Sequence, residues 1–124
     1  MTGATPARFP FKPQQRLLSP PAFNRVYALR RRVVNALFSI NFAPNELGHA
    51  RLGLSIGSKA VGKAVDRNRV KRQVRESFRR AAPDLPAMDF VVGARNGART
   101  AHNAALREGL EGLWNQVRKQ CVVS

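Results

Sequence analysis

The sequence predicts a single α+β domain in which a small mixed sheet packs against helices in the order α-β-β-β-α-β-α. Three patterns predict this class: helical spacing of apolar residues in three segments, alternation in two short segments, and one continuous apolar run. A chain of 124 residues that is 44% hydrophobic can bury one core. Its 22 Lys and Arg residues face only 7 Asp and Glu, a net charge of +15, so a polyanionic partner is expected.

The N-terminal segment is predicted to be separate from the folded domain. Residues 1–15 contain three prolines and no periodicity, which is typical of a mobile arm, and the domain is expected to span residues 16–120. No apolar run approaches the ~20 residues of a membrane span, and no signal peptide is visible, so a cytoplasmic protein is expected.

A first helix is predicted over residues 20–29. Ser19 and Pro20 supply an N-cap and a first-turn proline, and apolar residues follow at helical spacing. Phe23 and Tyr27 lie one turn apart on the same face of this helix. Such a pair either enters the core or forms a platform on which nucleobases stack, and from the residues alone the core is favoured.

The next segments have the period of two that half-buried strands show. Residues 38–42 and 51–56 alternate apolar and polar side chains, and a short polar loop separates them. We therefore expect these two strands to form an antiparallel hairpin, with a further short strand at residues 33–35 before it.

Residues 59–80 carry the strongest signal, with nine Lys or Arg residues against two acids, a local net charge of +7. From Ala64 onward the apolar residues recur at spacings of three and four, which predicts an amphipathic helix with Val70, Val74 and Phe78 on its buried face. The opposite face is lined by Asn68, Arg72, Arg75 and Arg79, with Lys71 at its flank. Like charges one turn apart repel, and an RNA or DNA backbone would relieve that repulsion.

The last third of the chain is predicted to complete the core. Residues 90–94 form a continuous apolar run, which is typical of a strand covered on both faces. A final helix is expected over residues 101–119, with Trp114 as a core anchor. The first helix is expected to lie apart from the other two, leaving a groove between Phe23, Tyr27 and the sheet.

The chain shows no catalytic constellation of its own. Its seven acids form no pair in a metal-binding motif, and His49, His102 and the single Cys121 have no partners in sequence that suggest a nucleophile or a general base. The residues therefore indicate a protein that binds a nucleic acid while another component reacts.

The sequence resembles the bacterial ribonuclease P protein component. Arg67-Asn68-Arg69, followed by Val70-Lys71-Arg72 and by Arg75-Glu76-Ser77-Phe78-Arg79, is similar to the RNR signature helix of that family. The resemblance covers residues 16–119 and includes the segments RLLSP before Phe23, RLGLSI at residues 51–56, LPAMDFVV at residues 85–92, and Leu113-Trp114. It departs at Ala60, where a second Lys is frequent, and at Tyr27, where Phe is common.

The resemblance implies a subunit of an endoribonuclease whose RNA subunit carries the catalysis and removes the 5′ leader of precursor tRNA. It also implies a left-handed crossover, a 1:1 complex with that RNA, Mg²⁺ bound mainly by the RNA, and no covalently bound cofactor. The residues that it assigns to catalytic-RNA binding are Lys59, Lys63, Arg67, Asn68, Arg69, Lys71, Arg72 and Arg75. It assigns the 5′ leader to Phe23 and Tyr27, with Phe38 or Ile40 on the strand as a further candidate, and so shifts the aromatic pair toward a stacking role.

Two other functions share part of this pattern. A structural RNA-binding protein, such as a ribosomal protein, would have the same charge and size but would not need an aromatic groove. A protein nuclease acting alone would need the acid or histidine groups that the sequence does not bring together.

Overall fold

The computed structural model describes residues 20–29, 31–45, 47–57 and 61–123, so the predicted arm lies outside the described residues. The elements are α1 (Pro20–Ala28), β1 (Arg32–Val34), β2 (Phe38–Pro44), β3 (Arg51–Ser55), α2 (Ala64–Ala81), β4 (Met88–Ala94) and α3 (Asn103–Val123), with short 3₁₀ helices η2 (Ala82–Asp84) and η3 (Asn96–Arg99). This order confirms the predicted α+β class. None of the helices in these described ranges is long and apolar enough to cross a membrane.

The four strands form one mixed sheet in the order β1-β2-β4-β3. β2 pairs antiparallel with β1 and with β4, whereas β3 pairs parallel with β4. The predicted hairpin between residues 38–42 and 51–56 is therefore wrong, because β4 lies between these two strands. β4 is largely buried on both faces and takes an inner position, and the parallel β3–β4 pair needs a crossover, which α2 supplies.

Asn35 organises the turn that joins the short strand β1 to its partner β2. The Asn35 Oδ1 atom accepts hydrogen bonds from the backbone N–H groups of Leu37 and Phe38, both at 2.9 Å. Asn35 was predicted to be in the strand, but its side chain closes the β1–β2 turn instead, because Asn bonds readily to backbone two or three residues ahead.

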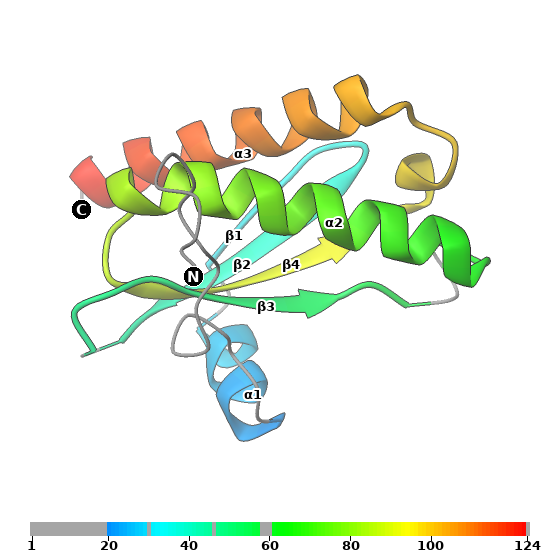
Figure 1. Cartoon of the computed structure of the whole chain (residues 1–124). Helices are drawn as coiled ribbons and strands as arrows, with labels where there is room; N and C mark the ends of the chain where they lie inside the picture. The colour runs from blue at the N-terminus through cyan, green and yellow to red at the C-terminus, as the bar shows by residue number, and fades with distance from the viewer. Residues whose placement is uncertain (1–19, 30, 46, 58–60, 124) are drawn as a thin grey trace, which may run out of the picture.

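α2 and α3 lie side by side on one face of the sheet, and α1 lies beneath the opposite face (Figure 1). The main core lies between the sheet and the two long helices, and it contains Phe38, Ile40 and Phe42 from β2. Trp114 is 1% exposed. Its ring lies 5.4 Å from that of Phe90 and 5.9 Å from that of Phe78, measured between centroids. This confirms Trp114 as a core anchor.

A smaller cluster fixes α1 on the other face. Val26 is fully buried against Ala43 and Val91, and Phe23 packs beside them while remaining partly exposed. Because side chains alternate along a strand, β2 presents Ala43 to α1 and its large apolar residues to the main core. The first helix is thus separated from α2 and α3 by the sheet, as the sequence predicted.

Candidate nucleic-acid interface

α2 presents a basic face to solvent because its apolar stripe is buried. Its buried residues are Val70, Val74, Ser77, Phe78 and Ala81. On the opposite side Asn68, Arg72 and Arg75 are exposed, Lys71 is half-buried at the flank, and Lys63 is exposed just before the first turn. Seven of the eight predicted RNA contacts, these five together with Arg67 and Arg69, thus belong to α2 or its N-cap. The eighth, Lys59, lies outside the described residues.

Two arginines of the RNR motif donate hydrogen bonds within the protein. Arg67 Nη1 lies 2.8 Å from the Gly62 carbonyl oxygen and 3.3 Å from that of Val61. Arg69 Nη1 lies 3.0 Å from the Ala101 carbonyl oxygen and 2.9 Å from Asn103 Oδ1. The motif therefore connects α2 to the loop before it and to the start of α3.

The fold brings Arg99 to the N-terminal end of α2. Its guanidinium lies against Gly62, where a side chain at position 62 would overlap it. Arg95 precedes η3, Arg99 is its last residue, and both are exposed. Sequence reasoning missed Arg99, since it lies more than 30 residues from Gly62 along the chain and no local pattern relates the two.

Charge farther along α2 is partly neutralised. Arg79 forms an ion pair with Glu76 one turn earlier on the same helix. Arg72 and Arg75 carry their charge with no partner elsewhere in the described ranges. Arg72 and Arg75 therefore place uncompensated positive charge in the middle turns of α2.

The underside of the sheet forms a second surface, beside α1. Tyr27 is 40% exposed, and Phe23 is partly exposed next to it on the helix. Ser39 and Ser55 pair with Gly93 on either side, so three small residues form a row across β2, β4 and β3. They belong to the face on which α1 packs, because their strand neighbours Ile40, Leu54 and Val92 contact the main core.

Phe38 does not belong to this underside surface. It is 0% exposed and lies in the core between the sheet and the long helices. The assignment of Phe38 to the leader groove is wrong for this reason, and the alternative assignment of Ile40 is wrong too, because Ile40 is also fully buried there.

Asp89 fixes the position of α1 relative to the sheet. This fully buried carboxylate accepts hydrogen bonds from Arg51 and Asn45 and forms an ion pair with Arg25 of α1. Burial raises its pKa, but these hydrogen bonds and the two arginine charges outweigh burial, so the pKa of Asp89 lies below its usual range. The hydrogen bond to Asp89 raises the pKa of Arg51. Arg25 Nη1 also donates to the Pro44 carbonyl at 2.8 Å.

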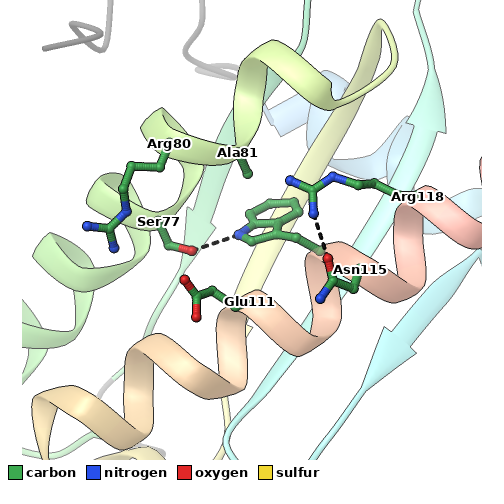
Figure 2. Close-up of a pocket in the computed structure, with 7 residues that line it drawn as sticks. Ser77, Arg80, Ala81, Glu111, Asn115 and Arg118 are labelled. Atoms are coloured by element: carbon green, nitrogen blue, oxygen red, sulfur yellow. Dashed lines mark hydrogen bonds between the residues drawn. The ribbon is translucent and has the colours of Figure 1, made fainter. Parts of the chain in front are cut away.

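An open pocket of about 270 Å³ lies between the C-terminal halves of α2 and α3 (Figure 2). Trp114 Nε1 donates to Ser77 Oγ at 2.9 Å on its wall, and Arg118 Nη1 donates to Asn115 Oδ1 at 2.7 Å. Arg80 and Glu111 bring opposite charges to the same rim. In the part of the chain that the structure describes, no three His, Cys, Asp or Glu side chains are grouped to hold a metal ion.

These features define a small basic α+β protein with an arginine-rich helix suited to an RNA backbone. The family model described as Ribonuclease P matches residues 11–118, and the chain belongs to this family. It is 43% identical to the ribonuclease P protein component of Idiomarina loihiensis over 107 residues, 86% of either chain. It is 45% identical to that of Photorhabdus laumondii over 111 residues, 90% of this chain and 91% of the relative.

Solved structures agree with the sequence relatives. The RNase P protein of Staphylococcus aureus superposes with a TM-score of 0.78 at 32% identity, covering 82% of this chain and 94% of that one. The Thermotoga maritima RNase P protein, in complex with 1-(4-fluorophenyl)-2-thiourea, gives 0.68 at 31% identity, with 78% and 92% coverage. These matches confirm the predicted family, and membership is consistent with a subunit in tRNA 5′-end processing.

Proposed function

We propose that the protein acts as the accessory subunit of ribonuclease P, in which the RNA subunit catalyses hydrolysis of the phosphodiester that joins the 5′ leader to precursor tRNA. The observation that carries this proposal is the exposed, uncompensated basic face of α2. In the described ranges, Asp89 is buried between two arginines, Glu76 is paired with Arg79, and no three His, Cys, Asp or Glu side chains are grouped to hold a metal ion.

The basic face of α2 binds the catalytic RNA in this proposal. Asn68, Arg72 and Arg75 are free to contact phosphates, and an arginine fork can donate hydrogen bonds to two phosphate oxygens at once. Each phosphate contact releases counterions, so binding weakens steeply with salt, by ~10³–10⁵ for a protein making 6–10 contacts.

The underside surface takes the single-stranded leader. Tyr27 and Phe23 offer ring faces on which bases stack. The small side chains in the row of Ser39, Gly93 and Ser55 leave room for a strand of RNA to lie on the adjacent sheet. The sheet separates this surface from α2, so one protein contacts two RNA segments on opposite sides.

The same arrangement gives the protein a role in metal-dependent catalysis without metal ligands of its own. Ribozyme and precursor tRNA are both polyanions, and a protein of net charge +15 reduces their repulsion. Mg²⁺ is held mainly by the RNA subunit and is bound more readily once the substrate is docked. We propose a 1:1 complex of protein and RNA that acts in the cytoplasm.

The test is precursor-tRNA cleavage at low Mg²⁺ and moderate salt with a bacterial ribonuclease P RNA alone, the protein alone, and both together. The proposal expects efficient formation of the mature 5′ end only in the mixture. A mixture no faster than the RNA alone, with the protein still bound, would favour a structural RNA-binding protein. Cleavage by the protein alone would indicate a protein nuclease.

A further inference from the structure

Arg67 and Arg69 differ from the other cations of α2 in how their guanidinium groups are used. Both donate hydrogen bonds to backbone outside α2, at 2.8 Å to Gly62 and at 3.0 Å to Ala101. Across the described ranges, the Arg72 side chain makes no hydrogen bond to another residue. The motif therefore contains side chains with internal partners and side chains free for a ligand.

Arg67 holds the loop before α2. Its Nη1 atom reaches back to two successive carbonyls, those of Val61 and Gly62. The Val61 side chain is fully buried, and its N–H donates to the Gly57 carbonyl at 3.1 Å. Residues 61 and 62 are thereby held from the core side and from the α2 side, and Lys63 follows them directly as the N-cap of the helix.

Arg69 holds the start of α3. It donates to the Ala101 carbonyl and to the side chain of Asn103, which is the first residue of α3. The chain between η3 and α3 is thus attached to the second turn of α2. Arg99, at the end of η3, lies just before this attachment and against Gly62.

We infer that Arg67 and Arg69 are positioning residues that arrange Lys63 and Arg99 beside the free face of α2, so that these cations meet RNA phosphates as one continuous surface. This inference rests on the proposed function, in which that surface binds the catalytic RNA. Charged donors bind carbonyl oxygens more strongly than neutral donors do, and cations that are already in place lose less freedom when RNA binds.

The first test uses the free protein and needs no RNA. Amide hydrogen exchange is measured in the wild type, Arg67→Ala and Arg69→Ala, with Arg72→Ala as the matched control that removes a charge without removing a hydrogen bond. Arg67→Ala is expected to speed exchange at Val61 about tenfold or more, and Arg69→Ala to do so at Leu106, whose N–H donates to the His102 carbonyl. Unchanged exchange at both positions would overturn the inference.

The second test asks whether Arg67 acts through Lys63 and Arg69 through Arg99. Affinity for a bacterial ribonuclease P RNA is measured in double-mutant cycles that combine Arg67→Ala with Lys63→Ala and Arg69→Ala with Arg99→Ala. Each arginine change is expected to weaken binding about tenfold in the wild-type background, but only about threefold or less once its partner is gone. The control cycle of Arg72→Ala with Lys63→Ala should be additive.

Additive cycles for Arg67 and Arg69 would mean that both contact RNA directly or act only through overall stability, and would overturn the inference. If the wild-type protein failed to bind the RNA, the proposed function would fail, and hydrogen exchange would still decide whether the two arginines hold their loops.

Discussion

Arg51 and Asp89 form a two-point ion pair across the parallel strands β3 and β4. Arg51 Nε lies 2.8 Å from Asp89 Oδ1, and Arg51 Nη2 lies 2.8 Å from Oδ2. The carboxylate is fully buried, and Arg25 of α1 binds it from the other side. The pair therefore connects the edge strand, the inner strand and the helix that carries Phe23 and Tyr27.

Asp89→Asn is expected to destabilise the fold by about 2–3 kcal/mol, because two arginines lose their common partner. The effect depends on pH. The folded-state pKa of Asp89 is lowered, so its contribution is present above the unfolded pKa of about 3.9 and is lost as pH falls through the folded value. Thermal unfolding from pH 7 to pH 2 should show this loss in the wild type and a flatter profile in Asp89→Asn. Exposed Asp84→Asn is the control, and an equal response of both variants would contradict the prediction.

Tyr27→Ala is expected to weaken precursor-tRNA binding by the holoenzyme by about 1–3 kcal/mol while leaving mature-tRNA binding nearly unchanged, since only the precursor carries a leader to stack on the ring. Tyr27→Phe keeps the ring and should bind as the wild type does. Leu29→Ala, an exposed apolar change just beyond α1, is the matched control. Tyr27 is a sharper probe than Phe23, whose packing against the Val26 cluster adds a stability effect. Equal weakening for both tRNAs would remove Tyr27 from the leader site.

Ser77→Ala is expected to cost about 1–3 kcal/mol, because it leaves the buried Trp114 N–H without its acceptor. For a chain of this size, in which each kcal/mol lowers the melting temperature by roughly 3–5 °C, the melting temperature should fall by roughly 3–15 °C. Ser55→Ala, at an exposed strand position, is the control. An unchanged melting temperature would mean that the Trp114–Ser77 hydrogen bond contributes nothing to stability, and Trp114 would then act through ring packing alone.

Local periodicity predicted the elements and their buried faces well. The apolar stripe of α2 from Val70 to Phe78 and the core position of Trp114 follow from spacings of three and four, since a helix places such residues on one side. The doubly buried β4 follows from its continuous apolar run. These features depend on a few neighbouring residues and are therefore visible in sequence.

Long-range pairing was not predictable in the same way. Alternation shows that Phe38 and Ser39 point to opposite faces of β2, but not which face α1 covers, and Phe38 was assigned to the wrong one. The prediction of a hairpin between β2 and β3 was wrong because nothing in the 45–50 connection reveals that β4 lies between these two strands. Arg99 reaches Gly62 only through the path of the chain after β4.

Gly93→Val tests the underside surface from the sheet rather than from α1. A side chain at Gly93 would contact Ser39 Oγ at 3.1 Å and the Ser55 carbonyl at 3.5 Å, so it would fill the row across which the leader is proposed to lie. Valine suits a strand, and the fold should tolerate it with a small shift of Ser39. Precursor-tRNA binding is expected to fall about tenfold or more relative to mature-tRNA binding, while affinity for the catalytic RNA, which α2 is proposed to contact on the far side of the sheet, should not change. Both affinities are measured on a variant whose melting temperature is within a few degrees of the wild type. A variant that folds and still prefers the precursor to the wild-type extent would place the leader elsewhere, because a filled row cannot hold the same strand.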